Sequence, residues 1–122
     1  MKTIAVVEDN ADNRLLLRAF LADAYEIVEY ETGMAALEAF ASMRPDLILL
    51  DVSLPGMDGL AVLSRVRGDE RLKKLPVIAL TAHAMHGDRE RFLKAGFDDY
   101  VSKPIVDEQV LLDAIRRLLE RA

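Results

Sequence analysis

The feature of the sequence that most limits the possible folds is a set of short apolar runs separated by longer segments with helical spacing. Four runs, each of four residues or fewer and rich in branched side chains, are predicted strands: 4–7, 47–50, 77–80 and 100–101. Short runs that are apolar throughout suit strands covered on both faces. A fifth candidate, 25–30, is interrupted by Glu26 and Glu29 and is therefore predicted to lie at a sheet edge.

A helical pattern of apolar residues follows each run. Thr32 can cap the second predicted helix, and Pro45 stops it. Gly96 ends the fourth helix, and the last begins near Asp107. The apolar residues that define the five helices are, in chain order, Leu16, Leu17, Phe20 and Leu21; Ala36, Leu37 and Phe40; Leu60, Leu63 and Val66; Phe92 and Leu93; and Val110, Leu111, Ile115, Leu118 and Leu119.

Five strand–helix units in succession predict an α/β fold. Parallel strands joined by right-handed helical crossovers form an open sheet with helices on both faces. For five units the common doubly wound order is 2-1-3-4-5, so we expect a flavodoxin-like, five-stranded parallel sheet flanked by five helices. Residues 1–122 are expected to form a single domain, with no output domain after the last helix. Ligands of such folds bind outside the carboxyl ends of strands one and three.

Composition excludes several classes of protein. The 122 residues include 21 acidic and 16 basic side chains, for a net charge of −5, and no cysteine. A disulfide framework and a cysteine-ligated metal site are therefore excluded. The acidic charge argues against nucleic acid and anionic membranes as partners. The run 4–7 is too short for a signal peptide, and no run approaches the roughly 18 residues of a membrane span, so we expect a cytoplasmic protein.

Polar residues with complementary chemistry stand at the carboxyl ends of the predicted strands. Glu8 and Asp9 follow the first strand and Asp51 ends the third, while Thr81 ends the fourth and Lys103 follows the fifth. We expect these residues to meet at one edge of the sheet. Carboxylates packed there repel one another unless a cation lies among them. Mg²⁺ is the expected ion, because it prefers oxygen ligands and shares its coordination shell with phosphoryl groups.

The loop after the first strand is acidic where a nucleotide-binding loop is rich in glycine. This excludes a site for a dinucleotide or a nucleoside triphosphate. What remains is a metal site that draws in a small phosphoryl donor, with a lysine, a hydroxyl group and an aspartate that can attack phosphorus. An aspartyl phosphate is a known kind of covalent intermediate, and phosphoryl transfer depends mainly on positioning and charge neutralisation.

Five short motifs occur in order along the chain: 7–10 (VEDN), 46–51 (DLILLD), 54–59 (LPGMDG), 81–82 (TA) and 102–104 (SKP). Together they resemble the receiver domain of two-component response regulators, the CheY-like superfamily, over essentially the whole length. Residues 81–85, 87–88 and 98–100 are most similar to single-domain regulators of the DivK kind and to receivers of hybrid kinases.

The resemblance implies a role for each residue at the strand ends. Asp51 would accept a phosphoryl group from a histidine kinase or a His-containing phosphotransfer protein. Asp9 and Asp51 would bind Mg²⁺ with the backbone carbonyl of Ser53, and Glu8 would act through bound water. Lys103 would contact the phosphoryl oxygens.

The resemblance also implies a switch in a signal transduction protein or phosphorelay, rather than a metabolic enzyme. Thr81 would move to hydrogen-bond the phosphoryl group, and Tyr100 would rotate inward into the space that Thr81 leaves. The peptide bond between Lys103 and Pro104 would be cis. A downstream protein would bind the face formed by the fourth helix, the fifth strand and the fifth helix.

Other readings of the same residues remain open from sequence. A phosphatase of the haloacid-dehalogenase type also uses an aspartyl nucleophile, but it has a second aspartate two residues later, where this chain has Ser53. A flavodoxin-like cofactor-binding module is a second alternative. It is disfavoured because carboxylates would occupy its phosphate-binding loop. Tyr100 could be an ordinary half-buried strand residue. His83 and His86 lack cysteine or a third histidine nearby, so solvated loop positions are expected for both.

Overall fold

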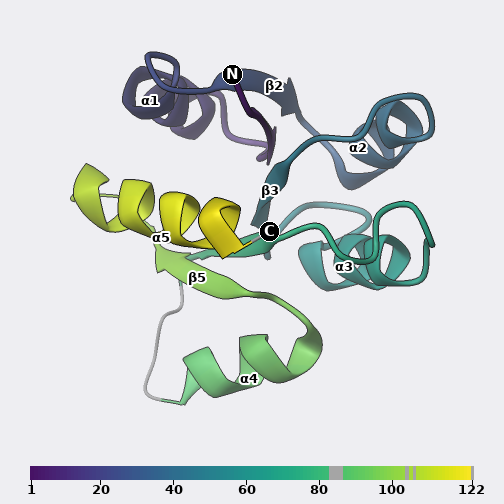
Figure 1. Ribbon diagram of the computed structural model, residues 1–122. Coiled ribbons are helices and arrows are strands. Elements are labelled where there is room, and N and C mark those ends of the chain that lie inside the picture. The colour runs from purple at the N-terminus through teal and green to yellow at the C-terminus, as the bar shows by residue number, and fades with distance from the viewer. Residues whose placement is uncertain (83–86, 104, 106, 122) are drawn as a thin grey trace.

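The computed structural model describes residues 1–82, 87–103, 105 and 107–121. Strands and helices alternate along the chain as expected (Figure 1). The elements are β1 (Thr3–Val7), α1 (Ala11–Leu21), β2 (Glu26–Tyr30), α2 (Gly33–Phe40), β3 (Leu47–Asp51), α3 (Gly59–Arg67), β4 (Val77–Thr81), α4 (Asp88–Ala95), β5 (Asp99–Ser102) and α5 (Glu108–Arg121).

The five strands form one parallel sheet in the order β2-β1-β3-β4-β5, which confirms the predicted topology. β2 lies at an edge of this sheet, as its two glutamates indicated. β1, β3 and β4 are buried almost throughout, because helices cover both of their faces. In a parallel sheet all carboxyl ends lie along one edge, so the residues that end β1, β3, β4 and β5 are neighbours there.

Two apolar layers hold the helices on the sheet. On one face α2, α3 and α4 pack over every second side chain of the strands, and Phe40, Leu63 and Phe92 lie in that layer. On the other face α1 and α5 pack over the alternate side chains, with Leu17 and Ile115 in that layer. Figure 1 shows the same division, with α1 and α5 on one side of the sheet and α2, α3 and α4 on the other.

Local capping signals act where the sequence places them. Thr32 accepts a hydrogen bond from the backbone N–H of Ala35 at 3.0 Å and so caps α2. Gly96 ends α4 with φ of 117°, a left-handed conformation that glycine adopts without strain. The carboxylate of Asp107 accepts from the backbone N–H of Gln109 at 3.0 Å, next to the start of α5.

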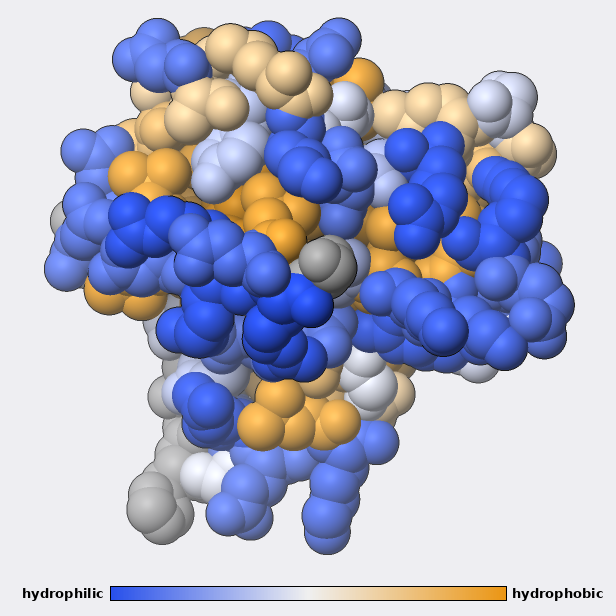
Figure 2. All heavy atoms as spheres, viewed as in Figure 1, coloured by the Kyte–Doolittle hydropathy of each residue, from blue (hydrophilic) through white to orange (hydrophobic). Residues whose placement is uncertain are grey.

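Three residues of the predicted apolar stripes are exposed instead: Leu60 by 45%, Leu93 by 38% and Val110 by 55%. Leu60 and Val110 lie in the first turns of α3 and α5, and Leu93 lies further along α4. At such positions a small rotation of the helix about its axis turns a side chain away from the sheet. In α3 the buried set is instead continued by Val62. Hydrophilic side chains cover most of the face in Figure 2, with apolar residues between them. Among the described residues no helix is both long and apolar enough to cross a membrane.

Candidate functional site

One lysine links two buried carboxylates at the carboxyl edge of the sheet. Glu8 follows β1 directly, Asp51 ends β3 and Lys103 follows β5. The Nζ atom of Lys103 lies 3.0 Å from Oε1 of Glu8 and 3.1 Å from Oδ2 of Asp51. Glu8 is fully buried and Asp51 is 2% exposed, so these ion pairs are largely shielded from water. The structure therefore brings together residues that are 95 positions apart in the sequence.

Burial and charge shift the ionisation of this group. Burial raises the pKa of the Glu8 carboxyl, and the neighbouring Asp51 raises it further, while the hydrogen bond from Lys103 opposes both effects. Burial alone would lower the pKa of the Lys103 ammonium. Its hydrogen bonds to Glu8 and Asp51 outweigh that effect and raise the pKa. Lys103 is therefore a charged donor to both side chains.

A third carboxylate completes the acidic cluster. One oxygen from each of Glu8, Asp9 and Asp51 lies within 4.8 Å of the others. Asp9 is exposed, so the cluster opens to solvent on its side. The backbone N–H of Ser53 donates to Oδ1 of Asp51 at 2.9 Å, which fixes the orientation of that carboxylate. An all-oxygen set with excess negative charge fits a hard divalent cation such as Mg²⁺.

The start of α3 packs directly on the backbone of the Asp51 turn. A Cβ atom at Gly59 would lie 2.4 Å from the carbonyl oxygen of Asp51 and 2.7 Å from Cα of Val52. Only glycine permits this approach. The side chain of Asp58 accepts from the backbone N–H of Ala61 at 2.9 Å and caps the same helix. Residues 58–59 belong to one of the five sequence motifs, but the motif alone does not predict this contact.

The N-cap residue and the first turn of α1 supply hydrogen bonds to Glu8 that were not predicted from the sequence. The backbone N–H of Asn10 donates to Oε2 of Glu8 at 3.2 Å, and Nδ2 of Asn13 donates to Oε1 at 3.3 Å. The guanidinium of Arg14 donates to the backbone carbonyl of Glu8 at 2.8 Å. The signal that could have predicted them is the spacing of Asn10 and Asn13, two and five residues after Glu8. These positions lie at the N-cap and in the first turn of the helix that follows β1.

Thr81 and Tyr100 lie on the same face of the sheet. Tyr100 pairs with Ala79 in the β4–β5 register, and Thr81 is two residues further along β4. Thr81 is 2% exposed. Tyr100 is half-buried, and its ring centroid lies 6.1 Å from that of Phe92 on α4.

Some expectations fall on residues that the structure does not describe. The predicted cis peptide before Pro104 is one of them, and the positions of His83 and His86 are the others. These three expectations stay predictions.

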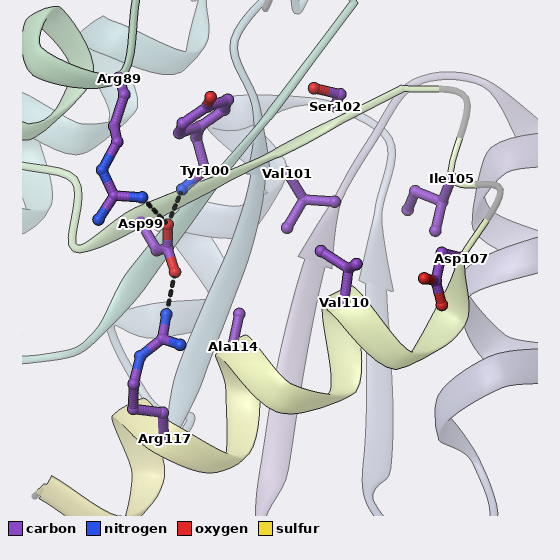
Figure 3. A pocket seen from close by; sticks show the side chains of 10 residues that line it. All are labelled: Arg89, Asp99, Tyr100, Val101, Ser102, Ile105, Asp107, Val110, Ala114 and Arg117. Carbon is purple, nitrogen blue, oxygen red and sulfur yellow. Dashed lines mark hydrogen bonds and ion pairs between the residues drawn. The ribbon is translucent and has the colours of Figure 1, made fainter.

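A surface pocket of about 420 Å³ lies beside this site, between α4, β5 and α5. Figure 3 shows Arg89 from α4 and Arg117 from α5 pointing toward Asp99 on β5. Asp99 is 6% exposed and forms ion pairs with both guanidinium groups. The ring of Tyr100 also lines the pocket, together with apolar side chains such as Val110. A movement of Tyr100 would therefore change the shape of this surface.

The fold and the acidic site at its edge define a class of protein. The response regulator receiver domain family matches the chain over residues 4–116. The chain belongs to this family, and it is a receiver domain of two-component signalling. The resemblance drawn from the five motifs is confirmed.

Two sets of known proteins refine this assignment. The polar-differentiation response regulator DivK of Brucella anthropi is 44% identical over 105 residues, which cover 85% of each chain, and DivK of Brucella abortus gives the same values. A response regulator structure from Chloroflexus aurantiacus has a TM-score of 0.91 at 32% identity and covers 98% of both chains. The receiver domain of a Pseudomonas aeruginosa sensor histidine kinase has a TM-score of 0.88 at 35% identity, also covers 98% of both chains, and has a magnesium ion coordinated in its active site cleft.

Proposed function

We propose that this receiver accepts a phosphoryl group on Asp51 from a histidine kinase or a His-containing phosphotransfer protein. The observation that carries the proposal is the position of Lys103, whose ammonium contacts Asp51 and Glu8 beside a cluster of three carboxylates. An aspartate held between a lysine and a cation-binding group is suited to attack on phosphorus, because both positive charges offset the charge of the incoming phosphoryl group.

Mg²⁺ fits the same cluster. Asp9, Asp51 and the backbone carbonyl of Ser53 would bind it, and Glu8 would act through a bound water. The ion would supply neutralisation of phosphoryl charge. The magnesium in the cleft of the Pseudomonas aeruginosa receiver supports this assignment.

The transfer needs no proton from the receiver. A carboxylate oxygen of Asp51 forms a bond to phosphorus while the bond between phosphorus and the donor imidazole nitrogen breaks, and the electron pair leaves with the imidazole. Lys103 then pairs with the phosphoryl oxygens, and the hydroxyl of Thr81 donates to one of them. No second carboxylate stands at position 53 to act as a general base, which favours a persisting acyl phosphate over turnover.

The output is a change in partner binding or onward transfer of the phosphoryl group, rather than metabolic catalysis. Movement of Thr81 toward the phosphoryl group would leave space for Tyr100, which lies on the same sheet face. Tyr100 lines the pocket between α4, β5 and α5, so we propose that face as the docking surface for a downstream protein in the cytoplasm. Nucleic acid and membranes are not expected as partners.

Incubation with acetyl phosphate and Mg²⁺, followed by intact mass measurement, tests the proposal. We expect one phosphoryl adduct that requires Mg²⁺ and is absent in Asp51→Asn. Asp23→Asn, a change at an exposed aspartate of the loop after α1, is the matched control and should form the adduct normally. An adduct that persists in Asp51→Asn, or no adduct in the unmodified protein, would contradict the proposal.

A second measurement tests the switch. Thr81→Ala should still gain the phosphoryl group, yet phosphorylation should no longer shift the NMR resonances of Tyr100 and of the pocket residues. Resonance shifts as large as those of the unmodified protein would show that the signal does not pass through Thr81.

A further inference from the structure

We propose that Asn13 is a positioning residue of the phosphoacceptor site, which holds the Glu8 carboxylate in place while Lys103 changes partners. The inference rests on the proposed phosphoryl transfer. Its observation is a separate one: Nδ2 of Asn13, in the first turn of α1, donates to Oε1 of Glu8 at 3.3 Å.

Three donors from the described part of the chain contact the Glu8 carboxylate. Its Oε1 receives the amide of Asn13 and the ammonium of Lys103, which lies 3.0 Å away, and its Oε2 receives the backbone N–H of Asn10. Because Glu8 is fully buried, bulk solvent has little access to replace a donor that is lost. A buried carboxylate that loses a hydrogen bond is no longer held in one orientation. This weakens its interaction with a bound cation.

The hydrogen bond from Lys103 to Glu8 is not kept throughout the proposed reaction. Its Nζ already divides its hydrogen bonds between Glu8 and Asp51, at 3.0 and 3.1 Å. When a phosphoryl group is bonded to Asp51, three further anionic oxygens compete for the same ammonium. The amide of Asn13 carries no charge and comes from the α1 side, where it lies with Leu16 and Leu17 around a small cavity next to Glu8. Asn13 is therefore the donor to Oε1 that stays when Lys103 turns away.

The side chain of Asn13 is separable from the stability of α1. The helix start is held by the Oδ1 atom of Asn10, which accepts the backbone N–H of Asn13 at 3.0 Å, and this bond survives any non-proline substitution at position 13. A carboxylate in the first turn also suits the helix dipole. Asn13→Asp should thus keep the helix as stable as before, while it replaces the donor to Glu8 by a repelling oxygen.

Three substitutions at one position distinguish positioning from a merely structural role. The rate of phosphorylation by acetyl phosphate, measured at saturating Mg²⁺, should fall about tenfold in Asn13→Leu, the effect of one hydrogen bond to a charged group, and further in Asn13→Asp. Asn13→Gln, which keeps an amide donor, should recover part of the rate. Leu15→Ala, at an exposed position on the same helix, is the control and should phosphorylate at the normal rate.

Two readouts do not depend on phosphorylation. The ¹³C carboxyl resonance of Glu8 should move in Asn13→Leu but not in Leu15→Ala, and calorimetry should show weaker Mg²⁺ binding by Asn13→Leu. Urea unfolding of Asn13→Leu should show one cooperative transition, which checks that a slower rate does not come from an unfolded variant. An unchanged Glu8 resonance together with a normal rate in the Leu and Asp variants would overturn the inference. If the unmodified protein itself gains no phosphoryl group, the proposed function fails, and the Glu8 resonance still decides the role of Asn13.

Discussion

The Nζ atom of Lys103 lies 3.1 Å from Oδ2 of Asp51, and the same ammonium also contacts the fully buried Glu8. This single positive charge separates two carboxylates that would otherwise face each other with little water between them. The relationship makes Lys103 important for folding as well as for the proposed phosphoryl binding, and the two roles can be measured separately.

Lys103→Met should destabilise the metal-free protein by about 3 kcal/mol at neutral pH, because it leaves two buried carboxylates without their counter-charge. The partial exposure of Lys103, 17% of its side chain, places the effect toward the lower end of the range for buried ion pairs. Urea unfolding in the presence of a chelator measures it. Combining Lys103→Met with Asp51→Asn should recover most of the loss, and a double variant that is no more stable than Lys103→Met would contradict the electrostatic explanation.

The raised pKa of Glu8 predicts a specific pH dependence of stability in the absence of metal. Between the ordinary value of 4.5 and the raised folded pKa, the native protein keeps a proton on Glu8 that the unfolded chain has lost. The stability from that proton is complete below 4.5 and disappears as the pH rises through the folded pKa. Glu8→Gln, which cannot ionise, should therefore gain stability relative to the unmodified protein as the pH rises from 4.5, by up to about 1.4 kcal/mol per pH unit.

Unfolding curves at a series of pH values with a chelator present give this difference directly. Glu120→Gln, at an exposed position of α5, is the control and should show no such trend. A stability difference for Glu8→Gln that stays constant with pH would mean that burial does not govern the ionisation of Glu8.

Two glycines give a matched test of how closely α3 packs on the Asp51 turn. Gly59→Ala places a Cβ atom 2.4 Å from the carbonyl oxygen of Asp51, so backbone must move, and we expect a loss of about 2–3 kcal/mol and slower phosphorylation. Gly68→Ala, at the other end of α3, meets its nearest atom at 3.3 Å and should change stability by less than about 1 kcal/mol. Equal effects of the two substitutions on folding and phosphorylation would contradict the importance of this contact.

The sequence predicted the fold and the meeting of Glu8, Asp51 and Lys103 for a simple physical reason. Parallel strands place their carboxyl ends on one edge of the sheet, so residues at those ends meet whatever the details of packing. The exposure of Leu60 and Val110 could not be predicted from the order of strands and helices, because it depends on the rotation of each helix about its own axis. The contact between Asn13 and Glu8 depends on the rotamers of both side chains, which apolar periodicity does not report.

The ion pair between Asp99 and Arg117 connects β5 to α5 on the face proposed for partner binding. Asp99 is 6% exposed, so removing the guanidinium in Arg117→Ala leaves a buried carboxylate with Arg89 at 3.8 Å as its remaining cationic partner among the described residues. We expect a loss of about 1–2 kcal/mol, reduced from the full cost of a buried charge because 58% of the Arg117 side chain is exposed. A double-mutant cycle with Asp99→Asn should give a coupling energy of about 1 kcal/mol.

The neighbouring Arg116 provides the control for this cycle. It pairs with Asp113 on its own helix, and both side chains are largely exposed, so Arg116→Ala should cost less than about 0.5 kcal/mol. If Arg116→Ala and Arg117→Ala are equally destabilising, the effect belongs to α5 as a helix and not to its link with Asp99. A real link has a consequence for the proposed switch, because Asp99 directly precedes Tyr100 and holds the backbone from which the Tyr100 ring is proposed to move. Phosphorylation of Arg117→Ala should then proceed at the normal rate, while the associated NMR shifts of the pocket residues become smaller.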